Sequence, residues 1–238
     1  MQVFSPTDVW VFGASQSFSS PTSTVNPYAA NFNGSKWQTF TVPGSGFISS
    51  VSAASKSNIW AVVGGSPLSG LDTTTSSSQQ TVVQWTGSAW QQPTQPTLAS
   101  GETLSAVLAE SGGKVLVAGS LKNSKKGTSP MAITWNGTAW SARSAAGASS
   151  TKWGVAGLVS DGHGGAWATA DASNKDTFEL LHLTGTKWTV DKPDFGKSDW
   201  ILLSLSLVPH SESVWGAGAV DDGSVAAGLI AIEGATPK

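Results

Sequence analysis

The chain has 238 residues, of which only 12% are charged, and its formal net charge is −2. A balance this close to neutral, with no basic stripe, argues against nucleic acid as a partner. Because the sequence contains no cysteine, disulfides, a catalytic thiol, iron–sulfur clusters and cysteine-type zinc sites are excluded. No apolar run reaches the roughly 18 residues of a membrane-spanning helix, so no membrane span is predicted.

Five similar units follow one another with a period near 50 residues. Each unit predicts an inner strand of small residues, a second strand with a tryptophan motif, a third strand that ends in a glycine turn, and a fourth strand that begins with another tryptophan. The turn glycines are Gly34, Gly87, Gly137, Gly185 and Gly234. A four-stranded unit repeated every 40 to 50 residues or so is typical of a β-propeller.

In chain order, the units divide one predicted domain, 1–238, into blades at about 1–45, 46–100, 101–150, 151–198 and 199–238. The second strands, which carry the first tryptophan motif, are expected at 9–13, 59–64, 115–119, 166–170 and 214–218. The last unit ends before a fourth strand with its tryptophan. We therefore predict an all-β, five-bladed β-propeller of four-stranded antiparallel blades, the last blade lacking a clear outer strand.

The connections between strands differ in length at the two faces of the predicted propeller. Asn-Gly at Asn33-Gly34 and Asn136-Gly137 predicts type I′ hairpins between the third and fourth strands, because both central residues of that turn need positive φ. The connections between second and third strands are longer, and those at 14–27 and 65–80 are rich in Ser and Thr. Long loops on a rigid scaffold usually carry function, so we expect a ligand on the face that bears them.

The segments Asp8–Gly13 and Trp135–Trp140 resemble the repeats of a family of bacterial secreted β-propellers with the tandem motif "DVWAVG…HWNGTxW". More distantly, Ser160–Trp167 resembles the Asp-box and photosystem-assembly-factor propellers. The resemblance extends over essentially the whole chain. It implies a toroid of five to eight blades that is usually exported, and it implies no shared activity.

Export implies a place outside the cell or on its surface, with the signal peptide beyond this chain, because Met1 leads directly into the first repeat. The chain departs from the family pattern twice. Leu116 replaces the second-strand tryptophan of the third unit, and Pro237 stands where the last unit should have its fourth-strand tryptophan.

Most of the twelve tryptophans recur at fixed places in the repeat. Periodic aromatic residues of this kind are expected to pack between neighbouring blades, where each buries a large apolar area. We predict such a structural role for Trp10, Trp37, Trp60, Trp90, Trp140, Trp167, Trp188 and Trp215, together with Trp85 and Trp135 on the third strands.

Trp153 and Trp200 do not belong to that pattern. Each stands two residues before the first core position of an inner strand, where the chain enters the strand from the long-loop face; Phe47 is adjacent to the corresponding place in the second unit. With Asp199 at the mouth of the last inner strand and Asp221 in a loop nearby, these residues suit sugar stacking or a protein contact. The alternative is that the two tryptophans cap the core.

No catalytic or metal-binding motif survives inspection. Gly196-Lys197-Ser198 lacks the first glycine and the helix of a phosphate-binding loop. His163, His182 and His210 do not have the spacing of metal ligands, and His182 is expected to pack among the polar residues of its strand. No cofactor and no metal are predicted.

We therefore predict a non-enzymatic binding or scaffold propeller that engages a glycan or a protein on the long-loop face and is a monomer. The alternative is a glycoside-active enzyme that uses acids of that face, drawn from Asp199, Asp221 and Asp222. Such an enzyme needs two carboxyl groups about 5–10 Å apart.

Overall fold

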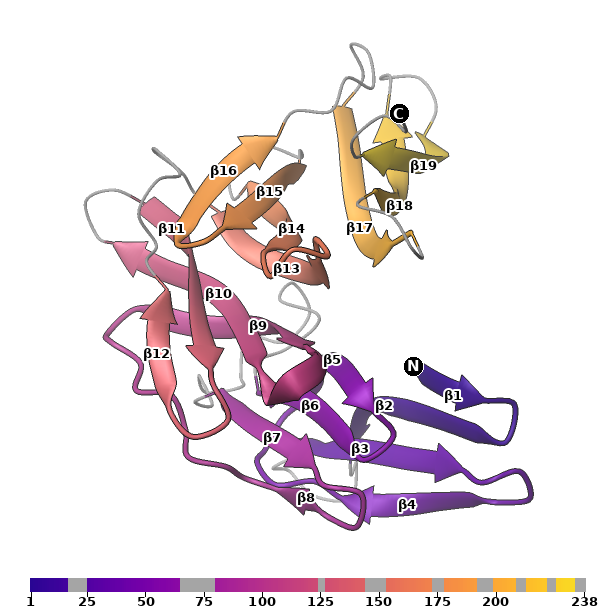
Figure 1. The fold of residues 1–238 in the computed structure, drawn as a ribbon. Coiled ribbons are helices and arrows are strands. Elements are labelled where there is room, and N and C mark those ends of the chain that lie inside the picture. The colour runs from indigo at the N-terminus through magenta and orange to yellow at the C-terminus, as the bar shows by residue number, and fades with distance from the viewer. Residues whose placement is uncertain are drawn as a thin grey trace. The chain divides into compact units, whose positions relative to one another are not determined.

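The computed structural model describes residues 1–16, 25–64, 80–123, 127–143, 153–172, 178–191, 199–208, 213–221 and 226–233. These residues form five antiparallel sheets, and each sheet lies within one of the predicted repeats (Figure 1). No α-helix occurs in these ranges, which contain one short 3-10 turn at Ser111–Gly113. The all-β prediction is confirmed.

Each sheet uses its strands in chain order, so that every strand pairs with the next one along the sequence. The first sheet contains β1 (Gln2–Ser5), β2 (Asp8–Gln16), β3 (Val25–Phe32) and β4 (Trp37–Thr41). The second contains β5 (Ile48–Ser55), β6 (Asn58–Val63), β7 (Thr81–Trp85) and β8 (Trp90–Gln91). The third contains β9 (Glu102–Ala109), β10 (Val115–Asn123), β11 (Gly127–Trp135) and β12 (Trp140–Arg143).

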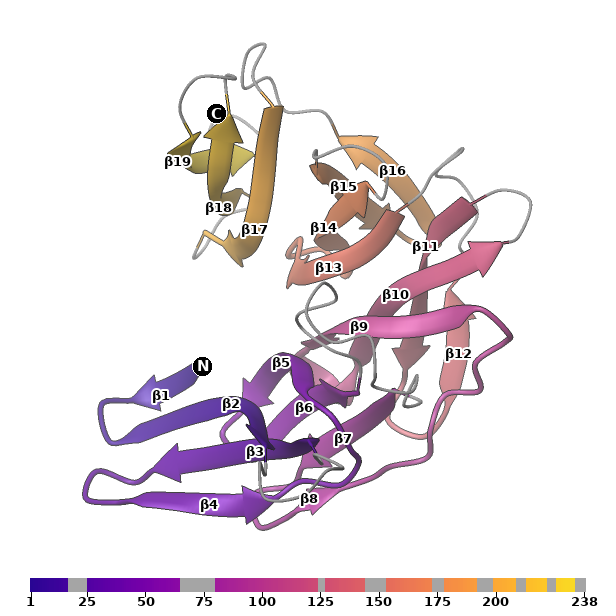
Figure 2. The same ribbon diagram turned by 180° about the vertical axis from the view of Figure 1, so that it is seen from behind.

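The fourth sheet contains β13 (Trp153–Ser160), β14 (Ala166–Ala172), β15 (Phe178–Thr184) and β16 (Lys187–Asp191). The fifth contains β17 (Asp199–Leu207), β18 (Val214–Asp221) and β19 (Ala226–Glu233), seen from behind in Figure 2. Within the described residues this last sheet has three strands. It is the sheet for which the sequence predicts no clear outer strand.

The chain groups into two compact units. The first consists of Met1–Thr97, Val107–Leu116 and Trp135–Trp140. The second consists of Leu98–Ala106, Val117–Thr134 and Ser141–Lys238. The first unit therefore holds the first two sheets, the second unit holds the last two, and the third sheet gives segments to both.

Glycine makes the turns between third and fourth strands, as predicted, but the expected central pair is wrong. Gly34 and Gly137 have φ of +91° and +101°. However, the Asn33 N–H donates to the Lys36 carbonyl at 3.2 Å, so the two central residues are Gly34 and Ser35 rather than Asn33 and Gly34. Only the glycine of the predicted pair therefore lies at the centre of the turn.

The asparagine before each of these glycines stabilises the turn with its side chain instead. Asn33 Oδ1 accepts hydrogen bonds from the Ser35 and Lys36 N–H groups, at 3.2 and 3.1 Å. Asn136 Oδ1 accepts hydrogen bonds from the Thr138 and Ala139 N–H groups in the same way, at 2.9 Å each. A short side chain that bonds the backbone two or three residues ahead is a common turn stabiliser, and it requires no positive φ of the asparagine.

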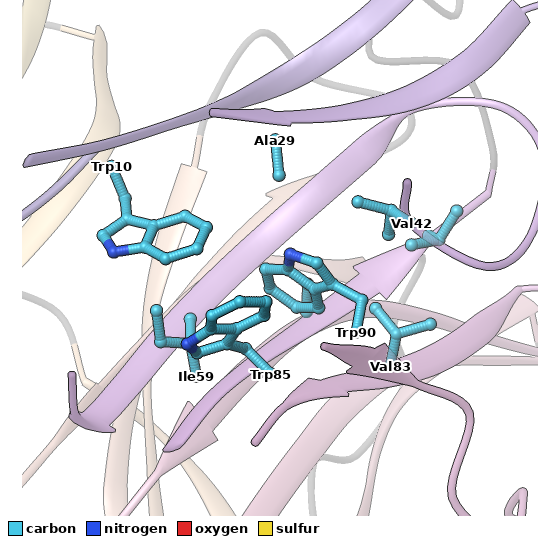
Figure 3. Close-up of a cluster of buried hydrophobic side chains, with 9 residues drawn as sticks. Trp10, Ala29, Val42, Ile59, Val83, Trp85 and Trp90 are labelled. Carbon is cyan, nitrogen blue, oxygen red and sulfur yellow. The ribbon is translucent and has the colours of Figure 1, made fainter. Parts of the chain in front are cut away.

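Tryptophans hold the first unit together. Trp10 of β2 lies 5.0 Å from the Trp85 ring and 6.2 Å from the Trp90 ring (Figure 3). Ile59 and Val83 are fully buried in the same cluster. Trp60 of β6 has an equivalent place, 6.3 Å from both Trp135 and Trp140. Packing of a second-strand tryptophan on the following sheet is therefore confirmed for these residues.

Two of the predicted structural tryptophans are buried within the second unit. Trp167 and Trp188 are 8% and 0% exposed. For Trp37 of the first unit and Trp215 of the second unit, packing against a neighbouring blade stays a prediction.

Small hydroxyl residues connect neighbouring inner strands. In the first unit the N–H groups of Val107 and Ala109 donate to Ser50 Oγ and Ser52 Oγ, at 3.0 and 2.9 Å. In the second unit Ser105 Oγ donates to the Val155 carbonyl. A backbone that must approach another backbone this closely favours small side chains, which explains the Ser- and Ala-rich inner strands.

Candidate functional site

The candidate residues gather where two inner strands begin. Trp153 is the first residue of β13, and Asp199 and Trp200 are the first two residues of β17. Trp153 lies opposite Ala172, at the end of β14, and Trp200 lies opposite Val220, near the end of β18. The structure describes the backbone at Trp153, Asp199, Trp200 and Asp221, whereas their side chains lie outside what it describes.

The two strands are oriented alike within the second unit. β13 and β17 lie next to each other. Val159 near the end of β13, and Leu205 and Leu207 at the end of β17, pack on one buried cluster around Trp167. Since a strand rises by about 3.3 Å per residue, the two starting tryptophan positions are each roughly 15–20 Å from that cluster. They therefore lie at the same, opposite end of the two sheets.

Each inner strand is irregular just after its tryptophan. The register shifts between Val155 and Gly157 in β13 and between Leu202 and Ser204 in β17. An equivalent shift separates Ile48 and Ser50 in β5. A bulge bends the strand and redirects side chains, and such bulges are common beside binding sites. The sequence gives no local signal for these bulges.

Two acids face each other across this end of the last sheet. Asp199, first in β17, is the register partner of Asp221, last in β18. Directly opposite residues of an antiparallel pair have Cβ atoms about 4.5–5.5 Å apart, and like charges there repel each other. The sequence predicts Asp199 at the mouth of an inner strand and Asp221 in a loop, and the structure makes both of them strand ends. No group of three or more metal-ligating side chains occurs among the residues that were placed.

Phe47 is separate from this group. It belongs to the first compact unit, whereas the other four candidates belong to the second. Its side chain is half-buried, and its carbonyl accepts a hydrogen bond from the Gly64 N–H at 2.8 Å. Phe47 does precede an inner strand, β5, as Trp153 and Trp200 begin theirs.

At the other end of the sheets, a third-strand side chain forms a hydrogen bond with a side chain at the turn between the first and second strands. This bond recurs in several sheets, and we call it the polar bracket. His182 Nε2 lies 2.9 Å from Asp161 Oδ2, and the histidine ring stacks on Trp167 with centroids 4.0 Å apart. Asp161 Oδ1 also accepts the N–H groups of His163 and Gly165, both at 2.8 Å. Burial raises the pKa of the Asp161 carboxyl, but the hydrogen bonds from His182 and the two backbone groups outweigh it and leave the pKa below its usual value.

The same bracket occurs twice in the first unit with other residues. Asn31 Nδ2 donates to Asp8 Oδ1 at 2.8 Å, and Gln84 Nε2 donates to Asn58 Oδ1 at 3.0 Å. In each case a third-strand side chain, three residues before the turn glycine, binds the side chain of a residue in the turn between the first and second strands or directly after that turn. This role is structural, in keeping with the packing role expected of His182. The shared spacing was available in the sequence, but the bond itself was not.

The described residues contain no helix long and apolar enough to cross a bilayer. No known protein family matches the chain. No curated protein matches its sequence.

Two solved structures are similar. One is the crystal structure of a protein of unknown function from Dyadobacter fermentans DSM 18053, with a TM-score of 0.54 and 15% identity, covering 85% of this chain and 66% of that one. This chain thus spans just under two thirds of that protein's length. The other is YCF48 bound to D1 peptide, with a TM-score of 0.36 and 13% identity, covering 95% of this chain and 85% of that one. The likeness to the Dyadobacter protein concerns the fold alone, and the five antiparallel sheets make this chain a propeller-like all-β protein.

Proposed function

We propose that the chain is a non-enzymatic, five-bladed β-propeller module that binds a glycan at the end of the sheets where β13 and β17 begin. One observation carries the proposal: two neighbouring inner strands each have a tryptophan among their first two residues and shift register from two residues after it, at the same end of the second unit. A charge-poor surface rich in Ser and Thr fits a protein that works outside the cell.

The residue types suit a sugar. An indole offers a flat apolar face together with one N–H donor, which matches the apolar C–H face and the hydroxyl rim of a pyranose ring. The carboxylate of Asp199 accepts hydrogen bonds only, so it favours a ligand rich in hydroxyl donors. A small-ligand site commonly has a few convergent polar groups around an aromatic surface.

A glycan array with the intact chain tests the proposal, followed by calorimetric titration of any hit. We expect Trp153→Ala and Trp200→Ala each to weaken binding about tenfold or more, a loss of about 1.4 kcal/mol. Trp37→Ala is the matched control, because it removes an equally large ring from a strand of the first unit, β4. If the folded chain binds no glycan on the array, the glycan proposal is wrong, and a protein partner or a passive scaffold remains.

A glycoside-active enzyme is the second candidate, and the pairing of Asp199 with Asp221 favours it. Directly opposite strand positions have Cβ atoms about 4.5–5.5 Å apart, from which two carboxyl groups can reach the separation of about 5–5.5 Å that retaining glycosidases use. Release of nitrophenol from a panel of aryl glycosides distinguishes the two candidates. We expect none; turnover that Asp199→Asn and Asp221→Asn both abolish would establish the enzyme instead.

A further inference from the structure

Two hairpin turns place an asparagine directly before a glycine. Residues 33–36 join β3 to β4, and residues 136–139 join β11 to β12. In both turns the asparagine N–H donates to the carbonyl three residues ahead, at 3.2 Å. The geometry of each turn is therefore set locally, by four consecutive residues.

The side-chain carbonyl oxygen of Asn136 is surrounded by donors from its own turn. Asn136 Oδ1 accepts hydrogen bonds from the Thr138 N–H, the Thr138 hydroxyl and the Ala139 N–H, each at 2.9 Å. Donors that converge on a carbonyl oxygen polarise it, and they bind it more strongly once negative charge develops there. The turn thus presents an amide carbon, Asn136 Cγ, that is prepared for attack by a nucleophile.

The backbone nitrogen of Gly137 is the nucleophile within reach. Because Oδ1 bonds to groups two and three residues ahead, the asparagine side chain folds forward across the Gly137 peptide. A bond between this nitrogen and Cγ closes a five-membered ring. The Gly137 N–H makes no hydrogen bond to any residue that the structure describes, and glycine has no side chain to hinder the approach.

We propose that Asn136 is a site of spontaneous deamidation, assisted by its own turn. The Gly137 nitrogen loses its proton and attacks Asn136 Cγ, while the Thr138 and Ala139 donors hold the oxyanion that forms at Oδ1. The Cγ–Nδ2 bond then breaks, Nδ2 takes up a proton and leaves as ammonia, and a cyclic imide remains. Water opens the imide at either of its carbonyls, which gives aspartate or isoaspartate.

The two products affect the turn differently. Aspartate keeps the length of the main chain, and its carboxylate accepts hydrogen bonds from the same donors. Isoaspartate adds a methylene group to the main chain, which disturbs the bond between the N–H of residue 136 and the Ala139 carbonyl. Either product adds a negative charge to a chain whose formal net charge is −2. The modification therefore changes the charge of the chain and, as isoaspartate, the β11–β12 hairpin.

Asn33 belongs to the same kind of site but should react more slowly. Its Oδ1 accepts its three bonds at 3.1–3.3 Å, longer than those of Asn136. A Cβ atom at Gly34 would lie 2.8 Å from Thr7 Cβ, whereas one at Gly137 meets no described atom within 4 Å. Ring closure requires the glycine nitrogen to move toward Cγ, and a turn that packs against a neighbour resists that movement.

Peptide mapping by mass spectrometry tests the proposal on the intact chain, incubated in its folded state at neutral and mildly alkaline pH. Conversion at Asn136 should be faster than at Asn33, and it should accelerate with pH because the Gly137 N–H must lose its proton. Thr138→Val removes the hydroxyl donor at nearly constant size and should slow conversion about two- to tenfold, the effect of about one hydrogen bond. Thr138→Ser keeps the hydroxyl and should react at the unaltered rate.

The same variants unfolded in urea are the control. There the donors are no longer held around Oδ1, so the rates of Thr138→Val and the unaltered chain should converge. Asn136→Thr should abolish conversion without disturbing the fold, because Thr86 begins the corresponding turn of the second sheet with the same bond, to the Ala89 carbonyl at 3.1 Å. The proposal is wrong if the folded chain shows no conversion at Asn136, or if Thr138→Val slows conversion no more in the folded than in the unfolded chain.

Discussion

At the scale of single residues, the Asp161 carboxylate shows how this chain uses a charge in its interior. The residue is only 6% exposed and accepts hydrogen bonds from His182 and from two backbone N–H groups. A buried carboxylate is costly unless such donors surround it. The short turn supplies them because Gly162 and Gly164 adopt positive φ, at +80° and +81°, and fold the chain back over the acid.

Acid should weaken the protein through this group. Its folded-state pKa lies below the ordinary value of 3.8, so the stability it contributes is complete above that value and is lost as the pH falls through the lowered one. We expect Asp161→Asn to reduce the free energy of unfolding at pH 7 by about 1–3 kcal/mol. It should also flatten the dependence of stability on pH between about 5 and 2. Urea denaturation at a series of pH values measures both.

Two substitutions of His182 separate the contribution of its ring stacking to stability from that of its hydrogen bond. His182→Ala leaves the Asp161 oxygen without a side-chain donor and should cost about 1–3 kcal/mol of the free energy of unfolding. His182→Gln should recover part of that loss, since Gln84 makes the equivalent bond in the second sheet. Equal losses in the two variants would mean that ring stacking on Trp167 dominates.

Two turn glycines form a matched pair. Gly34 and Gly137 both have positive φ, but a Cβ atom at Gly34 would lie 2.8 Å from Thr7 Cβ, whereas one at Gly137 meets nothing within 4 Å. Gly137→Ala should therefore cost only the conformational strain, about 1–2 kcal/mol. Gly34→Ala should cost clearly more, because the turn must also move away from Thr7. Thermal denaturation of the two variants side by side measures the difference, and identical midpoints would contradict the steric explanation.

At the scale of elements, a side chain continues the hydrogen-bond pattern of the short strand β8. The strand has two residues, Trp90 and Gln91. Beyond it, Gln95 Oε1 accepts the Val82 N–H at 2.8 Å and Gln95 Nε2 donates to the Val82 carbonyl at 2.9 Å. The amide thus makes the two bonds that a fourth-strand residue would have made with β7.

Removing that amide should open the edge of the second sheet. We expect Gln95→Ala to cost about 1–3 kcal/mol in the free energy of unfolding, because Val82 is buried and loses both backbone partners. Hydrogen exchange followed by NMR should show faster exchange at the Val82 N–H. Gln91→Ala is the control: this exposed residue pairs through its backbone, so exchange at Val82 should stay slow.

At the scale of the whole molecule, charge contributes little to stability. Only 12% of the residues are charged and the formal net charge is −2. Ring packing and backbone pairing carry the fold instead. We therefore expect the free energy of unfolding at pH 7 to change by less than about 1 kcal/mol between low and high sodium chloride, since exposed ion pairs are weak and easily screened. Urea denaturation at several salt concentrations checks this; a large loss in salt would reveal an ion-pair network.

The sequence predicts the sheets well because their signals are local. A turn glycine, with a large apolar residue before it and a tryptophan three residues after it, defines a hairpin without reference to the rest of the chain. The side-chain bonds of Asp161, the role of Asn33 and the bulges after Trp153 and Trp200 depend on contacts or on register. Their positions were predictable, whereas their chemistry was not.

The polar bracket has a consequence for how the repeats diverge. Asp8 with Asn31, Asn58 with Gln84, and Asp161 with His182 satisfy one geometric requirement with three different pairs. A change at one member alone leaves the other without its partner, so in these three repeats a matched exchange of both members should be tolerated better than an exchange of one. In the third sheet Thr134 stands at the corresponding position, and its buried hydroxyl makes no hydrogen bond with a described residue.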